Sequence, residues 1–196
     1  LVGALAPRLE VFLESARGDL LLDAPEARPV LAAAAAFDIP VFAHPINPEP
    51  LTQRLSRYGL SGVLLARGTT NGASLIALLE GGVFDELPKL KVIVTTLSMG
   101  ALLLARNFGR NAVRDDAEAV LRRHVYVDTL GLDPAVIRAA VDVLGADHVL
   151  TGSDWPVLND RPIRERATQA FIEAGLAPAD QVQVANGNVR RLLRID

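Results

Sequence analysis

Two residues of this sequence, His44 and Asp154, combine a reactive side chain with a position directly after an apolar run. His44 follows Ile-Pro-Val-Phe-Ala and precedes Pro45, which has no N–H group with which to continue a strand. We therefore expect the imidazole at the exit of a strand, where it can bind a metal ion or act as a general acid or base. The alternative is a histidine that only makes a structural hydrogen bond at a strand end.

Asp154 follows the run Val-Leu-Thr-Gly-Ser and precedes Trp155. A carboxylate at a strand exit can ligate a metal and can also accept a proton from water, so Asp154 is our candidate for both metal ligand and catalytic base. The alternative is an aspartate that caps a turn through its own backbone. Two such residues on separate strands favour a shared site over two unrelated structural roles.

Four further residues are candidates for contacts with a small-molecule substrate. Asp128 lies at the exit of an apolar run, although turn formation would explain it as well. Trp155 is expected in the wall of the pocket. Thr96 and Ser98 have hydroxyl groups whose pKa is too high for acid–base catalysis near pH 7, but these groups can hydrogen-bond a substrate.

The other two histidines, His124 and His148, precede apolar runs instead of following them. In an α/β barrel the amino ends of the strands form the face that serves stability, and the carboxyl ends form the face that binds substrates. We therefore assign both residues to structure.

Short apolar runs rich in Val, Ile and Leu predict the strands that position these residues. Continuous hydrophobicity is typical of parallel strands that are buried on both faces. Six strands are predicted, at residues 1–6, 9–13, 39–43, 91–95, 125–128 and 148–151. Pro7 is followed at once by Arg8, which leaves no room for a parallel crossover of roughly a dozen residues. Either the first two strands form a hairpin or residues are missing there, and we favour missing residues.

Helices are predicted between most of these strands, at residues 25–36, 49–58, 71–80, 115–123, 134–144 and 188–194. We expect Asp23 as N-cap of the first helix, and Asp133 and Gly145 as the caps of the fifth. Strands that alternate with helices indicate right-handed parallel crossovers, and hence an α/β fold. No linker or repeat interrupts the pattern, so we predict a single domain over residues 1–196.

Composition excludes several classes of partner. Half of the 196 residues are hydrophobic, and the net charge of −3 offers no basic patch for nucleic acid. The sequence has no cysteine, which removes thiolate metal sites and is compatible with the cytoplasmic location we expect. No apolar run reaches the roughly 20 residues that cross a bilayer, so we expect no membrane contact. Because the sequence starts at Leu1 and not at methionine, we expect that an N-terminal part is missing.

Four segments, residues 38–45, 82–93, 145–156 and 186–193, together resemble the amidohydrolase superfamily, in the branch of aminocarboxymuconate-semialdehyde decarboxylase. The resemblance implies a distorted (β/α)8 TIM-type barrel with one divalent metal ion, usually Zn²⁺ and sometimes Mn²⁺. It implies His44 and Asp154 as the ligands after the fifth and eighth strands. Its other ligands form a His-x-His pair after the first strand, which this sequence lacks. We therefore expect an incomplete barrel whose first strands would precede Leu1.

One segment departs from the pattern of this branch. Its members often carry a catalytic histidine in His-Gly-Gly after the sixth strand, where this sequence has Thr-Thr-Leu-Ser-Met-Gly at residues 95–100. The expected protein is a metal-dependent hydrolase or carboxy-lyase acting on a small carboxylated, lactone or amide compound, and hydrolysis survives the loss better. The alternative is a catalytically degenerate barrel that acts as a binding or scaffold protein. By analogy with the family, we expect that the protein can form a homodimer in either case.

Overall fold

The computed structural model describes residues 11–45, 50–113, 116–154 and 162–195. Within these ranges a five-stranded sheet has the order β1-β4-β5-β6-β7, and every neighbouring pair is parallel. The strands are β1 (Val11–Glu14), β4 (Val41–His44), β5 (Val92–Val94), β6 (Val125–Asp128) and β7 (Val149–Leu150). Because all five strands are parallel, their carboxyl ends lie at one edge of the sheet.

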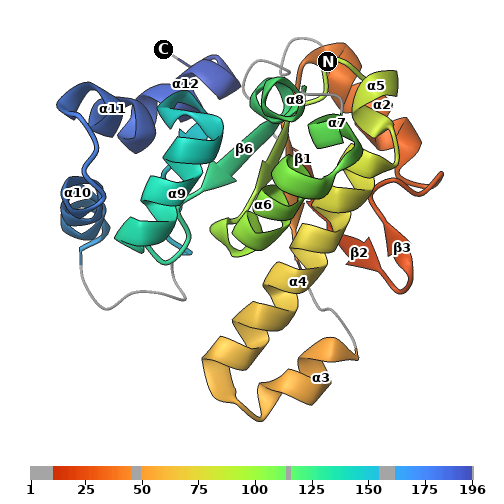
Figure 1. The fold of residues 1–196 in the computed structure, drawn as a ribbon, viewed down its shortest axis with the longest axis horizontal. Coiled ribbons are helices and arrows are strands. Elements are labelled where there is room, and N and C mark those ends of the chain that lie inside the picture. Colours follow the sequence, from red (N-terminus) through yellow and green to blue (C-terminus); the bar gives the residue numbers. More distant parts are fainter. Residues whose placement is uncertain (1–10, 46–49, 114–115, 155–161, 196) are drawn as a thin grey trace.

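Helices connect the parallel strands (Figure 1). The connection from β4 to β5 is the longest and contains α3 (Leu51–Ser56), α4 (Gly59–Glu80) and α5 (Val83–Glu86). The other connecting helices are α2 (Arg28–Phe37), α6 (Met99–Phe108), α7 (Arg110–Val113), α8 (Ala117–His124) and α9 (Pro134–Leu144). The chain continues with α10 (Ile163–Glu173), α11 (Pro178–Val182) and α12 (Asn188–Leu193).

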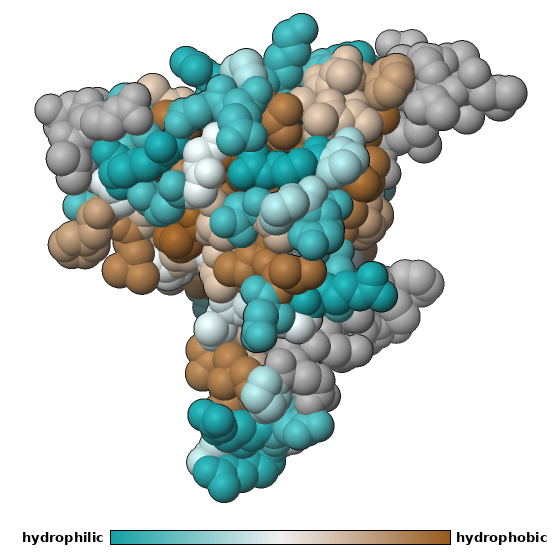
Figure 2. Space-filling view, turned by 90° about the vertical axis from the view of Figure 1, so that its right-hand side faces the viewer, coloured by the Kyte–Doolittle hydropathy of each residue, from teal (hydrophilic) through white to brown (hydrophobic). Residues whose placement is uncertain are grey.

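Shorter elements complete the fold. A small antiparallel pair, β2 (Ala16–Arg17) and β3 (Leu20–Leu21), follows β1. A 3-10 turn at Thr96–Ser98 joins β5 to α6, and another at Ala146–His148 precedes β7. A π-helical turn at Gln183–Gly187 lies between α11 and α12. Helix α3 and the first half of α4 extend away from the rest of the chain, and hydrophilic residues cover the tip of this projection (Figures 1 and 2).

The two faces of the sheet are covered to different extents. One face carries fully buried valines, among them Val41, Val92 and Val127, which pack in the main core with leucines of α4, α6 and α9. The opposite face carries a smaller cluster of Ile93 and Leu150 with Leu192 of α12. Helices thus pack on one face, and the C-terminal helix covers part of the other.

Most predicted strands are confirmed. The predictions at residues 39–43, 91–95, 125–128 and 148–151 correspond to β4, β5, β6 and β7, and the prediction at 9–13 overlaps β1. The predicted strand 1–6 and the junction of Pro7 with Arg8 lie outside the described residues. Helix α9 has the predicted bounds, with the Asp133 side chain accepting from two backbone N–H groups and Gly145 at the C-cap.

Other boundary predictions were wrong. Asp23 is not the N-cap of α2, because the helix begins later, with Ala27 at the N-cap and a proline in its first turn. The helix predicted to begin at residue 71 begins at Gly59, and the one predicted over 49–58 is reduced to Leu51–Ser56. Helices α5, α6, α7, α10 and α11 were not predicted. Glycines in the first half of α4 and the weak apolar period of α10 reduce the helical signal of these two segments.

Helix α4 corrects the expectation that no segment is long and apolar enough to cross a membrane. By length and composition this helix of 22 residues could cross a membrane, but 50% of its most apolar stretch is buried inside the structure. Leu75 and Leu78 of α4 are fully buried in the main core. These contacts are those of a crossover helix that packs on a sheet.

Candidate active site

A cavity lies where several strands of the sheet end. It is lined by residues from β1, β4, α4 and the segments after β5, β6 and β7: Phe12, Phe42, His44, Pro45, Leu64, Arg67, Thr95, Leu97, Asp128, Leu130 and Asp154. Its volume of about 160 Å³ suits a small molecule. His44, Asp128 and Asp154, which we selected from the sequence, therefore face a common space.

His44 is the last residue of β4 and is partly buried. Its ring lies 6.2 Å from that of Phe42, measured between centroids. Burial lowers the pKa of His44, the positive charge of Arg67 lowers it further, and the negative charge of Asp154 raises it. The net effect favours the neutral imidazole near pH 7, which is the form that binds metal ions.

Asp154 lies four residues beyond the end of β7, and its backbone adopts a left-handed conformation with φ of 54°. This conformation is uncommon for a residue other than glycine and costs on the order of 1 to 3 kcal/mol. The same conformation occurs at Asp38, Leu132 and Arg194, so it does not by itself mark a functional site. Here the carboxylate borders the cavity that His44 also lines.

Asp128, the last residue of β6, is a carboxyl group with an unusual protonation equilibrium. Burial raises its pKa to about 6, the charge of Asp154 raises it as well, and hydrogen bonds from the backbone N–H groups of Leu130 and Thr96 oppose the rise. These groups donate to one carboxylate oxygen, at 3.0 Å and 3.4 Å. Asp128 can therefore gain or lose a proton close to neutral pH.

The structure gives the two hydroxyl candidates partners within the protein. Thr96 donates its hydroxyl to the carbonyl of Leu130 at 3.0 Å, and Ser98 donates to the side-chain oxygen of Asn71. Their neighbours Thr95 and Leu97 line the cavity. Substrate contacts by Thr96 and Ser98 stay predictions. Trp155 lies outside the described residues.

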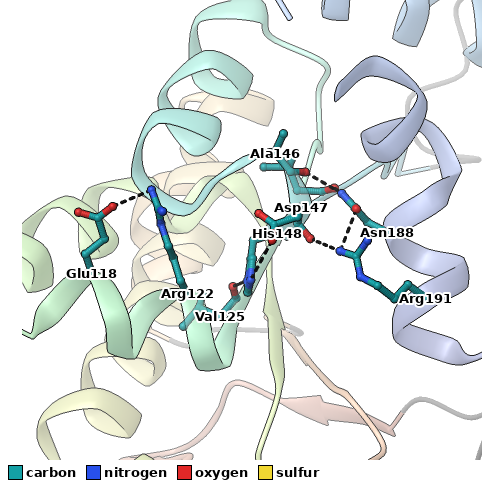
Figure 3. Close-up of polar contacts among 9 residues, drawn as sticks. Glu118, Arg122, Val125, Ala146, Asp147, His148, Asn188 and Arg191 are labelled. Carbon is teal, nitrogen blue, oxygen red and sulfur yellow. Dashed lines mark hydrogen bonds and ion pairs between the residues drawn. The ribbon is translucent and has the colours of Figure 1, made fainter. Parts of the chain in front are cut away.

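The remaining histidines lie at the amino ends of strands. The ring of His124 stacks on Phe84 at 4.4 Å and its Nδ1 is 2.7 Å from the carbonyl of Leu90. His148 repeats the arrangement, with its ring stacked on Tyr126 and its Nδ1 2.8 Å from the carbonyl of Val125 (Figure 3). These contacts agree with the structural roles expected for both.

Arg67 is a member of the site that sequence reasoning missed. It lies in α4, donates from Nε to the carbonyl of Pro45 at 3.0 Å and contributes to the cavity wall. Its charge acts on His44, as the lowered pKa of that histidine shows. An arginine directly after the apolar run Val-Leu-Leu-Ala was the available signal. The cavity thus contains a cation in addition to its carboxylates.

The described residues can supply part of a metal site. His44 and Asp154 provide a neutral imidazole and a carboxylate, both of which suit a divalent ion. Among the residues that the structure describes, no group of three or more His, Cys, Asp or Glu side chains could hold a metal. A complete site therefore requires ligands in addition to these two.

Comparison with known proteins agrees with this geometry. The sequence profile described as amidohydrolase matches residues 11–195. Gamma-resorcylate decarboxylase from Rhizobium sp. is 28% identical over 190 residues, which cover 90% of this chain and 57% of the relative. The corresponding enzyme from Rhizobium radiobacter is 27% identical with the same coverage. The chain thus spans a little over half the length of these relatives.

Solved structures show the same fold. A 2,6-dihydroxybenzoate decarboxylase complexed with 2,6-dihydroxybenzoate has a TM-score of 0.74 at 25% identity, covering 96% of this chain and 61% of that one. The 5-carboxyvanillate decarboxylase from Sphingomonas paucimobilis gives 0.78 at 23% identity, with 95% and 58% covered. A dihydroxybenzoic acid decarboxylase from Polaromonas sp., with bound manganese and 2-nitroresorcinol, gives 0.76 at 23%, with 94% and 60% covered. The predicted TIM-type α/β fold, present here in part, is confirmed.

Proposed function

The chain belongs to the amidohydrolase family, and from this membership we propose that its protein is a metal-dependent carboxy-lyase acting on a small aromatic acid. The observation that carries the proposal is that His44, Asp154, Asp128 and Arg67 line the same cavity. The names of the relatives, decarboxylases of hydroxylated or methoxylated benzoic acids, support the same class of reaction.

We assign a divalent metal ion to this cavity, with His44 and Asp154 as two of its ligands. When bound, the ion would stabilise negative charge on substrate oxygens. A donor set of nitrogen and oxygen without cysteine suits both Zn²⁺, our first expectation, and Mn²⁺, which the Polaromonas relative contains. Mn²⁺ and Zn²⁺ are therefore the two ions to compare.

The other cavity residues have roles that follow from their chemistry. The guanidinium of Arg67 would bind the substrate carboxylate through charge-assisted hydrogen bonds. Phe42, Leu97 and Leu130 supply apolar wall against which an aromatic ring can pack. The site thus offers separate surfaces for the charged group and for the ring.

Asp128 is our candidate for the proton donor, because its raised pKa leaves part of the population protonated near neutral pH. Its proton would pass to the ring carbon that bears the carboxylate. The bond from that carbon to the carboxylate then breaks, its electron pair returns to the ring, and CO₂ leaves. Asp128 regains a proton from solvent. Asp128 would thus take the role of the catalytic histidine that residues 95–100 do not contain.

Hydrolysis is the second candidate, and the segment after β5 favours it. Residues 95–100 include no histidine, so this segment offers the cavity no imidazole. Ser98 itself is buried and bonded to Asn71. In a hydrolase, Asp154 would accept the proton of an attacking water while Arg67 binds a carboxylate on the substrate.

Cytoplasmic location and homodimer formation stay predictions.

Turnover assays separate these functions. Protein expressed from the complete coding sequence is loaded with Mn²⁺ or Zn²⁺ and incubated with hydroxylated benzoic acids, lactones and amides. We expect CO₂ release from a benzoic acid, and its loss in His44→Ala and Asp154→Ala. Cleavage of a lactone or amide without CO₂ would establish the hydrolase instead. Metal binding without any turnover would leave a binding protein.

A further inference from the structure

A fully buried asparagine, Asn71, lies behind the cavity at the carboxyl ends of three neighbouring strands. Its amide nitrogen donates to the hydroxyl of Ser15, just after β1, and to the carbonyl of Ala43 in β4, at 2.8 Å and 2.6 Å. Its side-chain oxygen accepts from the backbone N–H of Thr95, just after β5, at 3.1 Å. The hydroxyls of Thr95 and Ser98 donate to the same oxygen.

Glycines in α4 allow this close approach. A Cβ atom at Gly68 would lie 2.8 Å from both the Cβ and the carbonyl oxygen of Leu97, and one at Gly72 would lie 3.0 Å from the Cβ of Ala101. Gly68 and Gly72 are four residues apart, so they share one face of the helix. The lack of side chains on this face brings α4 against the segment after β5, and Asn71 reaches the strand ends.

Every partner of Asn71 is next to a cavity residue or is one. Ala43 directly precedes His44, and the backbone N–H of Ser15 donates to the carbonyl of His44 at 3.0 Å. Thr95 lines the cavity itself, and Ser98 follows the cavity residue Leu97. One side chain thus connects the strand that carries His44 with the opposite wall of the cavity.

We propose that Asn71 is a positioning residue, which fixes the His44 side chain and the wall formed by Thr95 and Leu97 in one relative geometry. The planar amide donates to the carbonyl of Ala43 from its nitrogen and accepts from the N–H of Thr95 at its oxygen, which an apolar side chain cannot do. Removing it leaves buried donors and acceptors without partners, which favours rearrangement of the strand ends. The consequence for metal binding rests on the proposed function, whereas the geometric consequence does not.

Asn188 provides a matched control at the other end of the sheet. It is also fully buried, and its amide donates to the carbonyls of Ala146 and Val149, both at 2.7 Å (Figure 3). Its side-chain oxygen accepts from Arg191 at 3.0 Å. These partners surround the amino end of β7, so loss of Asn188 removes a comparable set of bonds away from the cavity.

The test uses the three histidines of the chain as reporters. Imidazole ¹H–¹⁵N spectra of the metal-free protein are compared for wild type, Asn71→Ala and Asn188→Ala. We expect Asn71→Ala to shift or split the signals of His44 and to leave His124 and His148 unchanged. Asn188→Ala should change the signals of His148 and leave those of His44 unchanged. If Asn71→Ala fails to fold, Asn71→Ser replaces it. Serine keeps one polar group at this position and leaves space for a water molecule that can bond to the remaining partners.

Metal affinity gives the second measurement. In titrations with Mn²⁺, the affinity of Asn71→Ala should be lower than that of wild type by about tenfold or more. The affinity of Asn188→Ala should be unchanged, even when both variants lose similar thermal stability. Unchanged His44 signals in folded Asn71 variants, or equal changes of His44 in Asn188→Ala, would overturn the inference. If wild type binds neither Mn²⁺ nor Zn²⁺, the proposed function fails, and the His44 spectra still decide the role of Asn71.

Discussion

The charge of Asp154 raises the pKa of His44, against the lowering effects of burial and of Arg67, because the two strand-end residues line one cavity. They lie far apart in the sequence and meet because the carboxyl ends of β4 and β7 belong to the same edge of a parallel sheet. Arg67 joins them from the crossover helix α4. This grouping of a neutral imidazole, two carboxylates and a guanidinium leads to the following predictions.

Replacement of Arg67 by methionine should weaken substrate binding more than it slows the chemical step. We expect KM for a benzoic acid to rise by roughly tenfold or more, since a charge-assisted hydrogen bond contributes about 1.5 to 3 kcal/mol. Arg67→Lys should restore part of the loss. Steady-state kinetics test this, with Arg138→Met as control because Arg138 pairs with Asp142 on the exposed face of α9. A lower kcat at unchanged KM would contradict the assignment.

Asp128 should make the metal-free protein less stable as pH rises from about 4 to about 6. Its pKa is 3.8 in the reference state and about 6 in the fold, so the folded protein holds the proton more tightly. The contribution to stability is complete below about 4, decreases through this range and is absent above about 6. At about 1.4 kcal/mol per pKa unit it amounts to at most about 3 kcal/mol.

Urea unfolding at several pH values, with a chelator present, measures this effect. Other carboxylates also titrate in this range, so the informative quantity is the difference between wild type and Asp128→Asn. That difference should change across pH 4 to 6 and be constant above. A constant difference over the whole range would show that the Asp128 carboxyl has an ordinary pKa.

Asp154→Gly should remove metal binding without reducing the stability of the fold. Glycine adopts the left-handed conformation at this position without steric cost, and the strain of the aspartate is relieved. We therefore expect the metal-free variant to unfold at the wild-type temperature or above it. A clear decrease in Tm would show that Asp154 stabilises the fold, as a turn-capping residue would.

Gly68→Ala should destabilise the protein by about 1 to 3 kcal/mol, because its Cβ would meet Leu97 at 2.8 Å. Gly100→Ala, in α6, is the matched control. No atom lies within 4 Å of a Cβ at this position, and alanine favours a helix over glycine by about 1 kcal/mol. Thermal unfolding of the two variants should therefore show opposite shifts. Equal shifts would indicate that α4 does not need its close approach to the segment after β5.

The sequence predicted the structure best in segments whose residue types are restricted by burial or by helix capping. Strands β4, β5, β6 and β7 lie in short, mainly apolar runs, and a polar residue or proline follows each strand. His44, Asp128 and Asp154 could be selected for this reason. Helix α9 was predicted to the residue, because Asp133 and Gly145 cap it as local chemistry requires.

The remaining features depend on contacts between distant segments. Asn71 and Arg67 occur in a helix whose glycines weaken its local signal, and only the approach of α4 to the strand ends gives them partners. The bond from the hydroxyl of Ser98 to Asn71, a residue well before it in the chain, has no local signal either. The left-handed backbone of Asp154 likewise has no signature in its own sequence.

Diffraction from crystals grown with Mn²⁺, recorded near the manganese absorption edge, tests the central claim most directly. Protein from the complete coding sequence should show one anomalous peak in the cavity, within direct bonding distance of an imidazole nitrogen of His44 and a carboxylate oxygen of Asp154. A peak bound elsewhere, or no peak in crystals whose protein retains full activity, would contradict it.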